Sequence, residues 1–293
     1  MQLASLHALN KRKYVVLVFS ILLTFISSIF FFAHGLLSSR QAEVFFLNVG
    51  QGDAILIRTP HGRNILIDAG SDKTVSGELD RVLPIDKRNI DIAFATHPDL
   101  DHVGGFLSVL KTRKIGKFIH SGLLVGEPEY AEIAKQLKEK GIPVIQAYAG
   151  DVFSLGDGMK LFVLSPFRVE EVDDANEASL VLLLSYRGSH ILLTGDAPQS
   201  VENNLVHFYG DALYSPILKL GHHGSKTSSS KLFLKTVHPD YAIISAGCRN
   251  RYGHPHTEVL NRLATLHIPS LETCWDGTVH FRYSDGRWNI VQK

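Results

Sequence analysis

The pattern of apolar and polar positions divides the chain near residue 40. Residues 14–39 carry no charged side chain. The apolar stretch within them is about 20 residues long, enough to cross a bilayer as a helix. Lys11, Arg12 and Lys13 precede it, which predicts an uncleaved anchor with a cytoplasmic N-terminus. The alternative is a cleavable signal peptide, whose apolar core is about 7–15 residues. Both interpretations place residues 41–293 outside the cytoplasm.

After residue 40, short β-branched runs bounded by turn residues alternate with segments of helical spacing. Such runs predict strands, and apolar residues three and four positions apart predict helices. The predicted strands are Val44–Asn48, Ala54–Arg58, Asn64–Ile67, Ile90–Ala95, Ile142–Ile145 and Ile217–His222, and the predicted helices are Phe106–Leu110, Tyr130–Lys140, Pro198–Phe208, Ser229–Thr236 and Thr257–Leu266. The alternation indicates an α/β (α+β) fold.

The second half of the chain repeats the plan of the first. Residues 54–68 align without a gap with residues 180–194, and both segments hold two apolar runs around a glycine-containing turn. Each segment leads into a small acidic corner, and a following strand ends in histidine, at His97 in the first half and His222 in the second. This repeat predicts two βα halves, packed sheet to sheet and covered by helices, that form one domain over residues 41–293.

Charge and composition exclude two classes of protein. Lys and Arg number 30 and Asp and Glu 29, but four of the basic residues lie before residue 41, so residues 41–293 hold 26 basic and 29 acidic side chains, a net charge of −3. This balance excludes a nucleic-acid binder that relies on overall positive charge. Two cysteines exclude a disulfide scaffold and a Cys-rich zinc module. In an oxidising compartment Cys248 and Cys274 either pair or remain buried free thiols.

Histidine is abundant, with 15 residues, and it is the commonest metal ligand. The segment HPDLDHVGG at residues 97–105 follows a predicted strand. Alternate side chains of an extended segment point the same way, so His97, Asp99 and Asp101 can converge, and His102 joins them where the chain turns into a helix. One ion cannot use all four groups comfortably, so the spacing indicates two metal ions roughly 3.5–4 Å apart. The structural alternative is a polar loop with a helix cap.

This motif resembles the signature of the metallo-β-lactamase fold superfamily, and more closely the C-terminal domain of ComEC-type competence (DNA-uptake) proteins. Further motifs match in the same order: LNVGQGDA at 47–54, LIDAG at 66–70, LTGD at 193–196, GHHGS at 221–225 and NRYGHPH at 250–256. The resemblance covers about residues 43–288 and implies a four-layer αββα sandwich. It does not extend to the many-helix membrane domain of ComEC proteins, in whose place this chain has one expected anchor (residues 1–40).

The resemblance also implies a set of metal ligands. His97 and Asp99 would bind one ion, Asp101 and His102 the other, and Asp196 would bridge the two. One histidine of the pair would complete the second site. His223 is favoured as this ligand and His222 as a contact to the ligands or the substrate, but the opposite assignment stays open. Asp68 would hold the histidine loop in place.

The metal and its chemistry follow from this ligand set. Many members of the superfamily have one more histidine before the Asp196 strand, and residues 176–179 hold none. Together with Asp99 this makes the first site oxygen-rich, so Mn²⁺ competes with Zn²⁺. Two ions sharing a carboxylate lower the pKa of a bound water and make it a nucleophile. The bridging Asp196 favours hydrolysis of a phosphodiester or a thioester.

Other residues are expected around the reacting centre. Asp101, His222 and His254 are candidate catalytic residues, with His254 to stabilise charge or protonate the leaving group. Gln51, Asp53 and His256 are candidate substrate-binding residues. A plain glycine-rich turn, and a turn with surface histidines, are the structural alternatives. A basic run, Lys111, Arg113, Lys114 and Lys117, would guide a polyanion if it flanks the cleft and is otherwise a solvated face.

Three functions remain open from the sequence. The leading hypothesis is a membrane-anchored extracytoplasmic hydrolase with two Zn²⁺ or Mn²⁺ ions, a phosphodiesterase or nuclease that acts on single-stranded DNA beside a competence-channel protein. The second is a hydrolase of small or cell-wall phosphoesters, such as a phosphocholine-type ester, which the net charge of −3 fits better. The third is a catalytically degenerate binding protein in DNA uptake.

Overall fold

The computed structural model describes residues 17–30, 41–122, 128–167 and 174–291. The chain divides into two compact units, Met1–Gln41 and Ala42–Lys293. In the first unit residues 17–30 form a helix. No helix among the described residues is both long and apolar enough to span a membrane. The predicted anchor extends over residues 14–16 and 31–39, which lie outside the described residues, so the anchor and the signal peptide both remain predictions.

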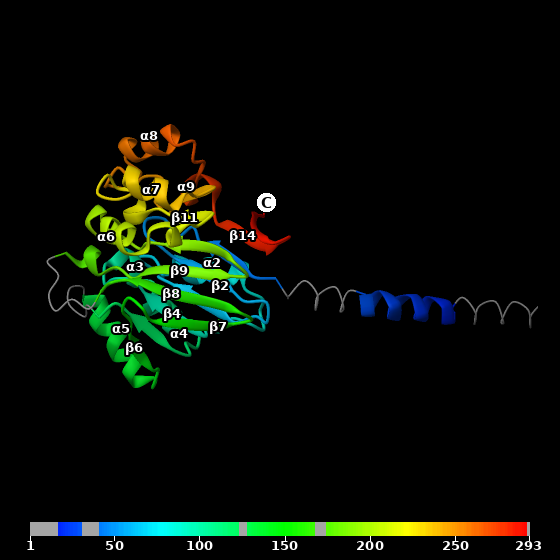
Figure 1. Cartoon of the computed structure of the whole chain (residues 1–293). Helices are drawn as coiled ribbons and strands as arrows, with labels where there is room; N and C mark the ends of the chain where they lie inside the picture. The colour runs from blue at the N-terminus through cyan, green and yellow to red at the C-terminus, as the bar shows by residue number, and fades with distance from the viewer. Residues whose placement is uncertain (1–16, 31–40, 123–127, 168–173, 292–293) are drawn as a thin grey trace, which may run out of the picture. The chain divides into compact units, whose positions relative to one another are not determined.

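The described part of the second unit contains two mixed β-sheets (Figure 1). The eight-stranded sheet has the order β15-β14-β1-β2-β3-β4-β5-β6, and the seven-stranded sheet the order β13-β12-β11-β10-β9-β8-β7. The strands are β1 (Glu43–Phe46), β2 (Ile55–Arg58), β3 (Asn64–Ile67), β4 (Ile92–Ala95), β5 (Phe118–His120), β6 (Val144–Gln146), β7 (Val152–Gly156), β8 (Met159–Ser165), β9 (Val181–Tyr186), β10 (Ser189–Leu193), β11 (Ile217–Lys219), β12 (Tyr241–Ile244), β13 (Ser270–Glu272), β14 (Val279–Ser284) and β15 (Arg287–Ile290).

The internal repeat is visible in both sheets. The hairpins β2–β3 and β9–β10 are antiparallel, and each is followed by a parallel neighbour, β4 beside β3 and β11 beside β10. One feature differs from the prediction of two separate halves. The C-terminal hairpin β14–β15 pairs through β14 with β1 and so joins the first sheet. That pairing connects the two ends of the domain, and no local sequence pattern reports it.

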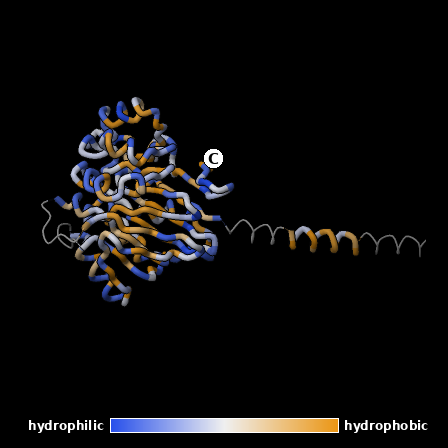
Figure 2. The backbone as a smooth tube through the Cα atoms, viewed as in Figure 1, coloured by the Kyte–Doolittle hydropathy of each residue, from blue (hydrophilic) through white to orange (hydrophobic). Residues whose placement is uncertain are grey.

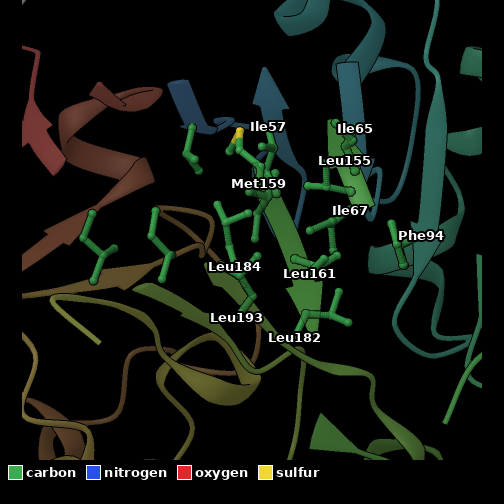
Figure 3. Close-up of a cluster of buried hydrophobic side chains, with 14 of the residues drawn as sticks. Ile57, Ile65, Ile67, Phe94, Leu155, Met159, Leu161, Leu182, Leu184 and Leu193 are labelled. Carbon is green, nitrogen blue, oxygen red and sulfur yellow. The ribbon is translucent and has the colours of Figure 1, made fainter. Parts of the chain in front are cut away.

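The central core lies between the sheets, where Ile57, Ile67 and Phe94 of the first face Leu161 and Leu182 of the second (Figure 3). Because successive side chains of a strand point to opposite faces, each sheet also presents apolar residues to a layer of helices. The apolar strands are apparent along the chain in Figure 2. The layers therefore run helix, sheet, sheet, helix, and the predicted αββα sandwich is confirmed for this unit.

Helices α2, α4 and α5 contribute buried apolar residues to the outer cluster of the first sheet, and α6, α7 and α8 do so for the second. Helix α2 has no counterpart among the predicted helices, and the others agree within a few residues at their ends. The helices are α2 (Thr74–Val82), α3 (Leu100–Val103), α4 (Phe106–Thr112), α5 (Pro128–Glu139), α6 (Gln199–Tyr209), α7 (Lys231–Val237), α8 (Thr257–Thr265) and α9 (Thr273–Asp276), with 3-10 turns η1 (Ala175–Ala178), η2 (Gly210–Leu213) and η3 (Gly221–Gly224).

Cys248 and Cys274 form a disulfide that joins the loop after β12 to helix α9. The two cysteines are 26 residues apart in sequence, so the bond closes a loop in the unfolded chain and reduces its entropy. Reduction is expected to lower the free energy of unfolding by about 2–4 kcal/mol. Thermal unfolding with and without reductant measures this. The Cys248→Ser/Cys274→Ser variant is the control, since its melting temperature should not respond to reductant, whereas an unresponsive wild type would contradict the expectation.

Candidate metal centre

The candidate site lies where strands of both sheets reach their carboxyl ends. Strands β3 and β4 are parallel neighbours in one sheet, and β10 and β11 in the other. The backbone N–H of Leu180, just before β9, donates to Thr96 O after β4 and so joins the two sheets, and the N–H of His222 donates to Gly195 O and joins the turns after β11 and β10. Residues that the sequence places far apart are therefore brought to one edge, as is usual for sites in sheets of this kind.

The HPDLDH segment folds into a turn that leads into the short helix α3. His97 lies two residues after β4, Asp99 stands before the first residue of α3, and His102 lies within that helix. His97 and His102 are buried, and their ring centroids are 4.0 Å apart. The side chain of Asp99 is 44% exposed and that of Asp101 27% exposed. The segment thus contributes two buried imidazoles on the protein side of the site and two part-exposed carboxylates on its solvent side.

Asp68 holds this turn from the end of β3, as the resemblance implied. Its Oδ1 accepts from the Thr96 backbone N–H at 2.8 Å, and its Oδ2 accepts from the Thr96 hydroxyl at 2.7 Å and from His102 Nδ1 at 2.8 Å. Asp68 is 1% exposed. Burial raises its pKa, an effect that the neighbouring His102 opposes. The carboxylate fixes the orientation of His102 and of the backbone that carries His97.

Replacing Asp68 with asparagine is expected to weaken metal binding by about 10–100-fold, the usual effect of losing a hydrogen-bond partner of a metal ligand. The amide keeps the size of the side chain but loses the charge and one acceptor oxygen that hold His102. Calorimetric titration of the metal-free chain with Mn²⁺ and Zn²⁺ measures the affinity. Asp72→Asn, an exposed position four residues away, is the matched control, and equal affinities for the two variants would contradict the assignment.

Asp196, after β10, lies at the centre of the histidines. Its Oδ1 is 3.3 Å from His102 Nε2, and its Oδ2 is 3.3 Å from His223 Nε2 and 3.9 Å from His97 Nε2. The backbone N–H of Asp196 donates to Ser179 Oγ at 3.2 Å. Ser179 lies in the stretch 176–179, where many members of the superfamily have a further histidine, and its hydroxyl supports the position of Asp196. Although burial opposes the effect, His223 and His102 hold the pKa of Asp196 well below its usual value.

The GHHG segment forms the other wall. The predicted strand Ile217–His222 ends at Lys219, because His222 and His223 adopt φ of 49° and 54° and turn the chain. This left-handed turn aims both rings at the centre. His223 is buried, with Nε2 3.2 Å from Asp101 Oδ2. His222 is 29% exposed, with Nε2 3.9 Å from Asp196 Oδ2. His223 therefore sits deep in the cluster and His222 at its open side.

The hydrogen bonds of the three buried histidines show that the centre suits a cation. The Thr96 hydroxyl donates to Asp68, so it accepts from His97 Nδ1 at 3.0 Å. His223 Nδ1 donates to Ser245 O at 2.8 Å, and His102 Nδ1 donates to Asp68. When the rings are neutral, each of the three Nε2 atoms therefore carries a lone pair, and all three face the carboxylate of Asp196. Among the described residues, His97 Nε2 and Asp196 Oδ1 have no hydrogen-bond partner, and His102 Nε2 is 3.3 Å from His223 Nε2.

The pKa values of these histidines follow from their burial and from the charges around them. Burial alone would lower the pKa of His102 and of His223, but Asp196 and the other carboxylates raise both pKa values well above the usual range. Burial and the neighbouring His102 lower the pKa of His97 to about 3. The excess of carboxylates attracts positive charge to the space among these groups. A divalent ion satisfies this demand, and neutral imidazole and carboxylate are ligands that Zn²⁺ and Mn²⁺ accept.

The donors fall into two groups around Asp196. His97 and Asp99 lie on one side, with His97 Nε2 3.7 Å from Asp99 Oδ2. Asp101, His102 and His223 lie on the other side. Possible ligand atoms of Asp53, His102, Asp196 and His223 lie within 4.8 Å of one another. The geometry brings together all six residues that the resemblance implied as ligands, and it adds a carboxylate, Asp53, that sequence reasoning had placed in the substrate cleft.

Asp53 is buried beneath His223 and paired with a lysine that the sequence analysis missed. Its Oδ2 is 2.6 Å from the Nζ of Lys219, and its Oδ1 is 3.4 Å from His223 Nδ1. Lys219 is fully buried and also donates to Leu220 O at 2.8 Å. The signal in the sequence is a lysine inside the apolar strand β11. Asp53 therefore supports the centre from its buried side. Because Asp53 is 1% exposed, this position does not suit the predicted contact with substrate.

The remaining predicted residues lie around the open side. Gln51 Nε2 donates to Asp101 Oδ2 at 3.4 Å. The His254 ring is 5.4 Å from His222 and 4.9 Å from His256, centroid to centroid. Burial, His223 and His222 lower the pKa of His254 to about 4. His256 Nδ1 accepts from the Lys226 N–H at 3.1 Å, so this ring atom is occupied by the protein itself.

A cleft of about 690 Å³ opens beside Asp99 and Asp101. Its lining includes Gln51 together with Arg249, Arg251 and Tyr252, three residues that the sequence analysis did not select although they lie in or beside the NRYGHPH motif. The predicted basic run does not line it. Arg113 of that run is buried and bonded to Asp80 at 2.6 Å, and Lys111, Lys114 and Lys117 are exposed elsewhere. The run is therefore largely a solvated face, and the cations at the cleft come from another loop.

Comparison with known proteins agrees with this geometry. Residues 47–248 match the family model described as Metallo-beta-lactamase superfamily. The chain is 33% identical over 266 residues to ComE operon protein 3 of Bacillus subtilis, covering 84% of this chain and 34% of that protein. It is 36% identical over 251 residues to Competence protein ComA of Neisseria gonorrhoeae, covering 84% and 33%. The chain thus spans about a third of the length of these relatives.

Solved structures show the same fold at low sequence identity. Zn(2+)-bound PqqB from Methylobacterium extorquens has a TM-score of 0.51 and 11% identity, over 76% of this chain and 85% of that one. CmlA, a diiron beta-hydroxylase from Streptomyces venezuelae, has a TM-score of 0.55 and 12% identity, over 83% and 54%. At these identities the likeness concerns the fold alone.

Proposed function

Because the chain belongs to the metallo-beta-lactamase superfamily, we propose that its folded unit is a metal-dependent hydrolase with two divalent ions, Zn²⁺ or Mn²⁺, that cleaves phosphodiesters. One observation carries the proposal. The Asp196 carboxylate lies between two groups of donors, with Nε2 atoms of His97, His102 and His223 all within 3.9 Å of its oxygens. Donors on both sides of one carboxylate argue against a degenerate binding protein. When bound, the ions would supply an activated water and polarise the phosphoryl oxygen.

The residues of the chain have distinct tasks in this proposal. His97 and Asp99 would hold one ion, Asp101, His102 and His223 would hold the other, and Asp196 would be shared. Asp68 and the Asp53–Lys219 pair keep the rings oriented from the buried side. Asp99 and Asp101 are part-exposed and border the cleft, so the scissile phosphate enters from there.

Two histidines on the open side are available to the substrate. The ring centroids of His222 and His254 are 5.4 Å apart, and neither side chain is as deeply buried as that of His223. His254 Nδ1 is buried without a hydrogen-bond partner among the described residues. We assign these two rings to the phosphoryl oxygens and to the leaving group, where charge develops during phosphodiester cleavage.

For the substrate we propose single-stranded DNA, because one relative is named Competence protein ComA and because arginines line the cleft. With it come two further proposals: attachment to the cell membrane through residues 14–39, with this unit outside the cytoplasm, and partnership with a competence-channel protein. The net charge of −3 over residues 41–293 supports a second substrate class, small or cell-wall phosphoesters.

The test uses the full chain with Mn²⁺ or Zn²⁺ and two substrates, bis(p-nitrophenyl) phosphate and a labelled single-stranded oligonucleotide. Metal-dependent cleavage is expected, and Asp101→Ala is expected to lower it by about 10²–10³-fold because a ligand is lost. Competition between the oligonucleotide and phosphocholine esters separates the two substrate classes. A wild-type chain with no metal-dependent activity on either substrate would refute the proposal.

A further inference from the structure

The mouth of the cleft carries a group of exposed side chains that the hydrolytic centre does not use. We call Arg249, Arg251, Tyr252 and Trp275 the rim surface. The first three line the cleft together with Asp99 and Asp101. The disulfide holds Trp275 near Arg249, because Cys248 precedes Arg249, Cys274 precedes Trp275, and the Cα atoms of the two cysteines are 5.0 Å apart. The rim surface is therefore one covalently joined platform beside the metal ligands.

Aromatic exposure on this platform is large. Trp275 is 77% exposed and Tyr252 is 48% exposed. One exposed aromatic ring is ordinary on a protein surface, but two beside a polar cleft mark a place where an apolar or aromatic group of a ligand binds. One face of the Tyr252 ring stacks on His254, at 5.7 Å between centroids and 21° between planes. The indole of Trp275 thus offers the more accessible flat surface.

The positive charge of the rim surface is available to a ligand. Arg249 and Arg251 are exposed, and in the described part of the chain neither forms an ion pair within 4.0 Å. Arg251 Nη2 donates to the Tyr252 hydroxyl at 2.7 Å, and its guanidinium lies 4.9 Å from the centre of that ring. The guanidinium is thereby oriented at the cleft. Guanidinium groups match the geometry of phosphate oxygens and bind them by paired hydrogen bonds.

From this juxtaposition we infer that the rim surface binds a single-stranded nucleic acid next to the scissile bond, with the arginines on its phosphates and Trp275 stacked on a base. The inference rests on the proposed phosphodiesterase function and adds the residues that select the substrate. Stacking on an aromatic side chain tolerates any base and is a main source of affinity for single strands. A polyol phosphate has no group that stacks on Trp275. The quaternary ammonium of a phosphocholine ester can bind an indole face, but Arg249 and Arg251 repel this cation, so the platform favours nucleic acid over both alternatives.

Binding of two fluorescent 20-nucleotide probes to the full chain tests this. One probe is oligo(dT), the other has the same phosphate chain without bases, and anisotropy is read in chelator so that no cleavage is needed. Trp275→Ala is expected to weaken oligo(dT) binding about tenfold and to leave the abasic probe unchanged, and Trp275→Phe is expected to restore most of the affinity. Arg251→Ala is expected to weaken both probes and to reduce the salt dependence.

Exposed residues away from the cleft supply the controls. Phe208→Ala and Arg287→Ala remove an exposed aromatic and an exposed arginine and should bind both probes like the wild type. Equal affinity of wild type and Trp275→Ala for oligo(dT), or equal binding of both probes by the wild type, would overturn the inference. Because the readout needs no hydrolysis, failure of the proposed catalytic function appears separately, as absence of metal-dependent cleavage.

Discussion

Replacing Asp196 with alanine is expected to empty the metal centre and to lower phosphodiester hydrolysis by on the order of 10³-fold. The expectation follows from its position, since oxygens of this one carboxylate lie 3.3 Å from both His102 Nε2 and His223 Nε2. Without it, the two groups of donors share no ligand, and the negative charge that attracts cations into the cluster falls. Metal content per chain and kcat/KM on bis(p-nitrophenyl) phosphate measure the two effects.

Two further variants make the result specific. Asp196→Asn keeps the shape and removes the charge, so its loss of metal reports electrostatics without a cavity. Asp211→Ala removes an exposed aspartate in η2 and should keep metal and activity. If Asp196→Ala retained both its metal and its rate while folded by circular dichroism, the assignment of Asp196 as the shared ligand would be wrong.

Replacing Lys219 with methionine is expected to lower the free energy of unfolding by about 3–5 kcal/mol, because it leaves the Asp53 carboxylate buried without its partner. Lys219 and Asp53 are at most 1% exposed, and their charged atoms are 2.6 Å apart. Methionine fills most of the same volume, so the effect reports the lost charge. Chemical unfolding of the metal-free chain measures the change without any contribution from bound ions.

The double variant Asp53→Asn/Lys219→Met separates pairing from packing. It removes both charges, so it is expected to be more stable than Lys219→Met alone, which would show coupling between the two residues. Lys235→Met, an exposed lysine of α7, is expected to change stability by less than about 0.5 kcal/mol. A Lys219→Met variant as stable as Lys235→Met would show that the buried pair contributes no net stability.

Much of the fold could be predicted from the sequence because its signals are local. The hairpins around Gly62 and Gly188 follow from apolar runs on either side of a turn, and the strand β4 follows from its own run of apolar residues. The convergence of His97, Asp99 and Asp101 was predicted because the spacing of donors in a short loop limits where they can point. Helix α2 and the strands β5, β7, β8, β12, β13, β14 and β15 were not predicted, since short runs and mixed apolar and polar patterns do not distinguish them from loops.

The candidate site was likewise predicted in part from the sequence, and the rest required the structure. The HPDLDH donors and the histidine pair were visible as motifs, and the resemblance to a known family connected them to Asp196. The roles of Asp53 and of the basic residues required the structure. Asp53 lies in a glycine-rich turn whose sequence does not say which way the side chain points, and it is turned inward by a lysine from the other sheet. The basic run 111–117 was visible in the sequence, but the arginines that line the cleft are Arg249 and Arg251.

By itself, the sequence determined the longer helices other than α2, many of the strands, the repeat of two βα halves and the donors of the HPDLDH loop, because each depends on neighbours within a few residues. Only the tertiary structure decided that Lys219 pairs with Asp53, that β14 closes the first sheet beside β1, and that the disulfide carries Trp275 to the cleft. These contacts join residues far apart in the chain, and their partners are selected by how the two sheets pack, which no local period records.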